Sequence, residues 1–154
     1  MAAADLEAIV RELADKEAIR DLARRYAHLV WQQRTREVAE LFAEDGWMDT
    51  SLEDPIRGRA ALVEAFERLV GGEADFQPFV HNHVIDLAGD RATGTVYVDL
   101  RCTQDGRSMI GSGYYEDEYV RTAEDWKLHS RRLTLRFLVP LDEGWAAASG
   151  HSSE

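Results

Sequence analysis

The chain has 154 residues, with 29 Asp and Glu against 18 Lys and Arg, which gives a formal net charge of −11. This length fits one domain with its own hydrophobic core. The acidic balance argues against nucleic acid or an anionic membrane as partner, because both are bound by clusters of Lys and Arg. The single cysteine, Cys102, excludes an internal disulfide framework.

The N-terminal residues MAAADLEAIVREL lack the basic and apolar regions of a signal peptide. No apolar run approaches the roughly 20 residues that a bilayer-spanning helix needs. We therefore expect a cytoplasmic protein.

Helical periodicity dominates the first half of the chain. Apolar residues from Asp5 to Val30 form two stripes that are out of phase, so we expect a bend or a short arm before a main helix that starts at Asp15. Two further helices are predicted at Thr35 to Ala43 and at Arg59 to Val70, with a short strand between them at Trp47 to Leu52.

Four long β-runs follow, joined by short turns that include Gly89-Asp90 and Asp105-Gly106. They cover Phe76 to Leu87, Arg91 to Thr103, Arg107 to Val120, and Trp126 to Val139. Helices followed by a meander predict an α+β fold, in which a curved antiparallel sheet wraps helices on its concave side. We expect one domain over residues 1–145 and an unstructured tail over 146–154.

The Asp105-Gly106 hairpin fixes the pairing of its two strands. Counting outward sets Val96 against Tyr115, Val98 against Gly113 and Leu100 against Gly111, all on one face. Glycine within a strand marks a close approach of a ligand or of another backbone. This face therefore either lines a small-molecule pocket, with Val98, Leu100 and Gly113 as its floor, or carries glycines that only let the sheet bend.

The stretch His81-Asn82-His83 offers only two ligands on one side of a strand, so we expect no metal site there. A two-residue turn at Gly89-Asp90 would point His81 into the pocket, whereas a three-residue turn would point Asn82 inward. The alternative for both histidines is an outer sheet face that is buried in an oligomer.

The main helix carries Tyr26 on its buried stripe, with His28 and Trp31 near the border of that stripe. All three can overhang the sheet, although a tyrosine in this position is more often part of the core and a solvated His28 is the simpler interpretation.

In the last strand either Arg131 or Arg132 faces inward, because neighbouring strand residues point in opposite directions. A buried arginine needs an anionic partner, either a ligand or one of Asp99, Glu116 and Asp117.

The succession of segments resembles the SnoaL-like branch of the NTF2-like superfamily over about residues 12 to 140; the segments are DKEAIRDLARRYAHLV, ELFAEDG, IRGRAALVEAFERL, HNHVIDLAGDRATG and GSGYYEDEYVRTAEDWKLHSRR. The resemblance implies a cone-shaped α+β barrel, with three helices on a curved, mainly antiparallel sheet and a deep apolar pocket. The branch includes polyketide cyclases, scytalone dehydratase, bile-acid dehydratases, a dehydrochlorinase and ketosteroid isomerase, together with members that have no catalytic activity.

The resemblance also bears on single residues. Dehydratase and dehydrochlorinase members pair an aspartate late in the main helix with a histidine at the start of the first long strand. Those positions are Trp31 and Pro78 here, and neither can transfer a proton. The helix tyrosine of the bile-acid dehydratases matches Tyr26. The last-strand arginine of the dehydrochlorinase matches Arg131, which favours Arg131 over Arg132 as the inward residue.

Two functions follow as hypotheses. The first is a cofactor-independent lyase or isomerase, of the dehydratase or cyclase type, that acts on a hydrophobic aromatic or polycyclic small molecule. Its expected catalytic residues are Tyr26, His28, His81, Tyr115 and Arg131. Its expected substrate contacts are Trp31, Asn82, Val98, Leu100 and Gly113. The alternative is a small-molecule-binding or accessory protein of the same fold.

Exposed aromatic residues on the outer sheet face, such as Tyr97 and Tyr114, also predict a homo-oligomer, a dimer or trimer.

Overall fold

The computed structural model describes residues 2–123 and 125–146. These residues form three helices and six strands: α1 (Ala3–Trp31), α2 (Thr35–Glu40), β1 (Phe42–Asp49), β2 (Ile56–Arg57), α3 (Arg59–Leu69), β3 (Gln77–Ala88), β4 (Arg91–Gln104), β5 (Arg107–Arg121) and β6 (Trp126–Pro140). No helix within this part of the chain is long and apolar enough to cross a membrane. The tail predicted for residues 146–154 lies, apart from Ala146, outside the described residues.

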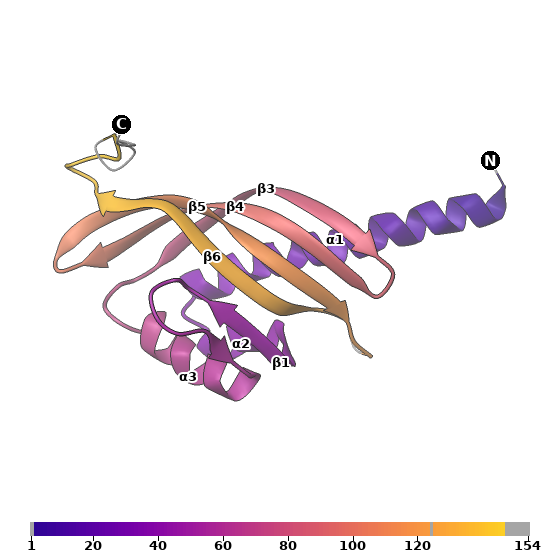
Figure 1. The fold of residues 1–154 in the computed structure, drawn as a ribbon, viewed down its shortest axis with the longest axis horizontal. Coiled ribbons are helices and arrows are strands. Elements are labelled where there is room, and N and C mark those ends of the chain that lie inside the picture. Colours follow the sequence, from indigo (N-terminus) through magenta and orange to yellow (C-terminus); the bar gives the residue numbers. More distant parts are fainter. Residues whose placement is uncertain (1, 124, 147–154) are drawn as a thin grey trace, which may run out of the picture.

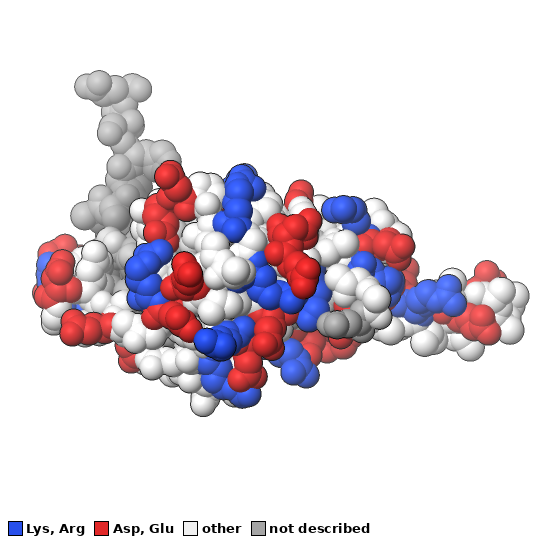
Figure 2. Space-filling view, turned by 90° about the horizontal axis from the view of Figure 1, so that it is seen from below, with Lys and Arg blue, Asp and Glu red and all other residues white. Residues whose placement is uncertain are grey.

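The strands form a single curved sheet that does not close, in the order β2-β1-β6-β5-β4-β3. Only the contact between β1 and β6 is parallel, and the other neighbouring strands are antiparallel. The helix α1 runs across one face of the sheet, while α2 and α3 pack beside β1 (Figure 1). This arrangement confirms the predicted α+β class. Acidic and basic side chains interleave over the face seen in Figure 2.

The predicted hairpin pairing is confirmed. Val96 lies opposite Tyr115, Val98 opposite Gly113 and Leu100 opposite Gly111. Side chains at every second position of β4 are buried, with Val96 0% and Val98 1% exposed. This face and the buried stripe of α1 therefore enclose the core.

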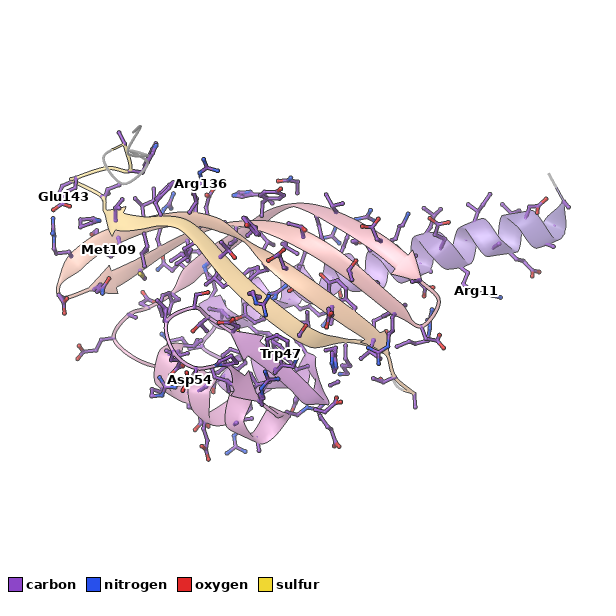
Figure 3. All side chains as sticks on the ribbon, in the orientation of Figure 1. Arg11, Trp47, Asp54, Met109, Arg136 and Glu143 are labelled. Carbon is purple, nitrogen blue, oxygen red and sulfur yellow. The ribbon has the colours of Figure 1, made fainter. Side chains whose placement is uncertain are left out.

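The structure corrects the prediction of a bend at Asp15, because α1 is one continuous helix. The carboxylate of Asp15 does not cap a new helix but accepts hydrogen bonds from Arg121 at 2.9 and 2.7 Å and from Trp126 Nε1 at 3.1 Å. The first turns of α1 extend past the sheet, as the position of Arg11 shows (Figure 3). In this arm the stripe of Leu6, Ile9, Val10 and Leu13 is exposed.

The β3–β4 turn has the two residues Gly89 and Asp90, since Ala88 pairs with Arg91. A bulge between Val80 and His83 then inserts one extra residue into β3. As a result, Val80 rather than His81 lies opposite Val98. A bulge of this kind reverses the side-chain alternation beyond it.

Candidate functional site

A small cavity of about 80 Å³ lies between the inner face of the sheet and the helices. Its lining is drawn from α1, β1, α3 and the inner face of the sheet: Tyr26, Val30, Met48, Thr50, Leu52, Phe66, Leu69, Val70, Phe76, Pro78, Leu100, Tyr115, Leu133, Leu135 and Leu138. Because Leu52 is 63% exposed, the cavity reaches solvent near the segment that joins β1 to β2. A cavity with these walls suits an apolar ligand.

Two tyrosines supply most of the polar character of this cavity. The rings of Tyr26 and Tyr115 meet edge to face, with centroids 5.8 Å apart. The Tyr26 hydroxyl donates to Met48 Sδ at 3.6 Å, whereas the Tyr115 hydroxyl makes no hydrogen bond within the described part of the chain. Burial raises the pKa of both phenols, so they are neutral hydrogen-bond donors.

Behind the two phenol rings lies Arg131, which is fully buried. Its guanidinium carbon is 4.4 Å from the ring centroid of Tyr26 and 4.0 Å from that of Tyr115, the geometry of a cation–π contact. Arg131 Nε and Nη2 donate to the two carboxylate oxygens of Asp117 at 2.8 and 2.7 Å. Burial alone lowers the pKa of Arg131, but the carboxylate of Asp117 outweighs it and raises that pKa, so the group is a permanent cation.

The inward position predicted for Arg131 is confirmed, because Arg132 pairs with Asp49 on the other face at 3.3 Å. The partner of Arg131 is a protein carboxylate rather than a ligand waiting in the cavity. Its Nη1 is the one buried side-chain polar atom without a hydrogen bond among the described residues. Arg131 stands behind the cavity wall and is not part of its lining.

The ion pair continues toward the surface as a chain of hydrogen bonds. The Tyr119 hydroxyl donates to Asp117 Oδ2 at 2.7 Å, and His83 Nε2 lies 2.8 Å from the same hydroxyl. Since the hydroxyl gives its proton to Asp117, His83 must donate through Nε2, which fixes its neutral tautomer. The chain His83, Tyr119, Asp117, Arg131 thus links the edge of the sheet to the back of the cavity.

Gly113 does not form the floor of the cavity. A Cβ at this position would lie 2.0 Å from the Thr134 carbonyl oxygen and 2.9 Å from Leu135 Cα. The strand β6 carries one extra residue here, because Ser112 pairs with Phe137 and Gly113 with Leu135. The glycine therefore permits a close approach of the β6 backbone at a bulge. Of the two interpretations of the glycines, the bending of the sheet is correct at Gly113.

Three other expected positions lie away from the cavity. His28 is exposed on α1, which is the solvated alternative. His81 is displaced by the bulge, and its Nε2 contacts Asp99 Oδ2 at 2.7 Å. Asn82, beside it in the bulge, is exposed. The structure therefore contradicts an inward orientation for all three, and its cause at His81 and Asn82 is the extra residue in β3.

Trp31 and Pro78, the positions that correspond to the expected Asp-His dyad, do lie together. Trp31 Nε1 donates to the Pro78 carbonyl oxygen at 2.7 Å, and the Trp31 ring meets Phe79 edge to face at 5.3 Å. Trp31 is 40% exposed and does not line the cavity, so it is not positioned as the expected substrate contact. A hydrogen bond without a titratable group thus occupies the place of the dyad.

Of the expected floor residues, Leu100 lines the cavity, whereas Val98 is packed in the core. The lining residues from β1, α3 and the end of β6 were missed, because no local pattern shows which strands converge. Asp117 was considered only as one of three partners for Arg131. The sequence did indicate an inward Asp117, since this residue follows Tyr115 by two positions and therefore lies on the same apolar face of the strand. Within the described residues, no group of three or more His, Cys, Asp or Glu could hold a metal ion.

Comparisons with known proteins agree with this geometry. A family model described as a SnoaL-like domain matches residues 11–132. A candidate aromatic ring hydroxylase from Novosphingobium aromaticivorans is 27% identical, with a TM-score of 0.76 over 85% of this chain and 96% of that one.

Two further structures are more distant in sequence. A candidate scytalone dehydratase from Novosphingobium aromaticivorans is 22% identical, with a TM-score of 0.76 over 84% of this chain and 89% of that one. A hexachlorocyclohexane dehydrochlorinase, LinA-type3 from Novosphingobium barchaimii, is 18% identical, with a TM-score of 0.78 over 86% of this chain and 93% of that one. At these identities the similarity establishes the fold alone.

Proposed function

Because the chain belongs to the SnoaL-like domain family, we propose that it binds a hydrophobic cyclic small molecule that carries an oxygen acceptor. The observation that carries this proposal is the composition of the cavity wall. Apart from Tyr26, Tyr115 and Thr50, every residue that lines it is apolar. Burial of a ring among these side chains supplies affinity, and a phenol hydroxyl orients the oxygen.

Tyr115 is the main polar contact in this proposal. Its hydroxyl is not engaged by a described residue, whereas that of Tyr26 is directed at Met48. A donor on the cavity wall that finds a ligand acceptor contributes about 1 kcal/mol net, or roughly a fivefold change in affinity. The cavity is small, at about 80 Å³, so a ring enters only if side chains at the mouth, such as Leu52, move aside.

A binding or accessory role is favoured over catalysis by the absence of a base. No Asp, Glu, His or Lys lines the cavity among the described residues, and Trp31 and Pro78 stand where relatives of this family are expected to have a dyad. Elimination and isomerisation both require that a proton be removed from carbon. The lining side chains can donate protons but are poor acceptors.

The second candidate is a cofactor-independent lyase or isomerase. It is favoured by the buried cation that lies against both phenol rings, 4.4 and 4.0 Å from their centroids. In this role Tyr115 donates a proton to the substrate oxygen, and Arg131 stabilises the charge that develops on the phenol. Two neighbours in structure are described as a candidate dehydratase and a dehydrochlorinase.

One experiment separates the two candidates. A panel of hydroxylated, ketonic and halogenated cyclic compounds is tested for a thermal shift and, by chromatography, for conversion. We expect shifts without conversion, and we expect Tyr115→Phe to weaken the oxygenated ligands about fivefold while leaving hydrocarbon analogues unchanged. Tyr97→Phe, on the outer face, is the matched control. Conversion by the wild type would establish the second candidate, and equal effects of both variants would refute the role of Tyr115.

A further inference from the structure

A second concave site lies outside the cavity, between α1 and β3. This α1–β3 hollow has a volume of about 190 Å³ and is lined by Arg20, Ala23, Arg24, Val80, His81, His83 and Val96. Four of these seven residues carry nitrogen donors, the other three are apolar, and none is acidic. In a chain with a net charge of −11, such a lining is unexpected.

Other grooves of the molecule have the opposite character. The groove on the outer sheet face includes Asp86, Glu116 and Glu118. The groove beside the N-terminal arm includes Glu12, Asp15 and Asp90. Of these three surface grooves, the α1–β3 hollow is the one whose lining contains no carboxylate.

Local sequence explains how the donors gather. Arg20 and Arg24 are four residues apart, so they lie on the same side of α1. β3 is an edge strand, and its bulge follows Val80. The extra residue brings both His81 and His83 to the edge that faces these arginines. The stretch His81-Asn82-His83, which is unsuited to a metal, therefore becomes part of a basic site.

The electrostatics at His83 favour negative charge beside the ring. Burial is the main cause that lowers the pKa of His83 to about 4; Asp117 opposes it, and Arg131, Arg20 and Arg24 act in the same direction as burial. The ring thus lies where three guanidinium groups act against a further cation. Its Nε2 is engaged by Tyr119, while Nδ1 makes no hydrogen bond within the described part of the chain.

Two nearby carboxylates compete for these donors but lie outside the lining. Glu17 accepts from Arg24 at 2.5 Å, lies 3.7 Å from Arg20, and has a side chain that is 60% exposed. Asp99 holds His81. Exposed ion pairs of this kind contribute at most about 1 kcal/mol, so a ligand with two or three anionic oxygens can displace Glu17.

We propose that the α1–β3 hollow binds an oxyanion, a carboxylate, sulfate or phosphate group, between the guanidinium groups of Arg20 and Arg24. Guanidinium groups recognise such oxygens through paired hydrogen bonds. Val80, Val96 and Ala23 form an apolar floor that suits a ring attached to the anionic group. The proposal is independent of the cavity described above.

Binding of an anion here is coupled to the uptake of a proton by His83. The charged and titratable groups around this ring are Glu17, Arg20 and Arg24 from α1, His81 from β3, Asp99 from β4, Asp117 and Tyr119 from β5, and Arg131 from β6. An anion beside Nδ1 favours the protonated ring, so it raises the pKa of His83. By linkage, affinity for the anion increases as the pH falls toward about 5.

The test is a titration with sodium sulfate followed by NMR, against sodium chloride at matched ionic strength. Sulfate keeps its charge over the pH range used. We expect saturable shifts of the His83 ring and of the Arg20 and Arg24 Nε–H signals. Arg24→Gln and Arg20→Gln should each weaken binding about fivefold or more, whereas Glu17→Gln should strengthen it by removing the competitor.

The matched control is Arg25→Gln, because Arg25 lies next to Arg24 but pairs with Asp21 and is 67% exposed. It should leave sulfate affinity unchanged. His83→Gln should abolish the increase in affinity between about pH 7.5 and 5. Benzoate and acetate form a second arm, in which tighter binding of benzoate indicates that the ligand presents a carboxylate on a ring. Non-saturable shifts, or equal weakening by Arg25→Gln and Arg24→Gln, would overturn the proposal.

Discussion

Replacement of Arg131 by methionine tests the charged network behind the cavity. The Arg131 and Asp117 side chains are both 0% exposed, and Nη2 and Oδ2 are 2.7 Å apart. Arg131→Met removes both hydrogen bonds and leaves the Asp117 carboxylate buried, with the Tyr119 hydroxyl as its remaining donor. Because an uncompensated buried charge is costly, we expect the variant to be substantially less stable.

The magnitude follows from the type of interaction. Breaking a buried ion pair by removing one partner costs about 3–5 kcal/mol, out of a typical total of about 5–15 kcal/mol. Two cation–π contacts, to Tyr26 and Tyr115, are lost as well. For a domain of this size each kcal/mol lowers Tm by about 2–4 °C. The expected decrease is therefore roughly 6–20 °C, in the absence of any ligand.

Urea and thermal melts of Arg131→Met, Asp117→Asn and the double variant form the assay. Asp117→Asn removes the negative charge but retains an acceptor for Tyr119. The double variant therefore has neither member of the buried ion pair charged. We expect it to be more stable than Arg131→Met by about 2 kcal/mol or more. If Arg131→Met were as stable as the wild type, the structural role of the ion pair would be refuted.

Further predictions concern single sites. Gly113→Ala should destabilise the protein by about 3 kcal/mol or more, since its Cβ would meet the Thr134 carbonyl oxygen at 2.0 Å. At Gly111 the closest atom is the side-chain atom Leu138 Cδ1 at 3.0 Å, so chemical denaturation should rank Gly111→Ala as the milder change. Burial sets the pKa of folded His83 at about 4 against 6.5, so the unfolded chain takes up the proton first and stability falls as the pH drops through this window. Because the ring is partly exposed, the loss should be about 1–2 kcal/mol, and His83→Gln should remove it from melts recorded across that range. We also expect a homo-oligomer, because Phe79 and Tyr97 on the outer face are 37% and 42% exposed; light scattering that gives a monomer at micromolar concentration would contradict this.

Much of the fold could be predicted because its signals are local. The turn at Asp105-Gly106 and strict alternation set the β4–β5 register. Alternation fails where a strand carries an extra residue, as β3 does between Val80 and His83 and as β6 does opposite Ser112 and Gly113. No residue type marks such a bulge unambiguously. The bulge in β3 turns His81 away from its predicted inward position. The bulge in β6 brings backbone against Gly113, where the prediction had the floor of a pocket.

The candidate site was predictable only in part, for a different reason. Tyr26, Leu100 and Tyr115 could be assigned from periodicity, because each lies on a buried stripe of its own element. The partner of Arg131 depends on which strands lie side by side. Once β5 and β6 are paired, Asp117 falls directly opposite Arg131, and two charges on the same inner face must neutralise each other.

The position of the charged groups limits what the cavity can do. The Asp117 carboxylate lies behind the phenol rings, and both of its oxygens already accept hydrogen bonds, from Arg131 and from Tyr119. The phenol rings of Tyr26 and Tyr115 separate this pair from the cavity. In the binding role proposed above, a ligand would meet phenol donors in front and a neutralised ion pair behind, an arrangement suited to recognition of an acceptor oxygen.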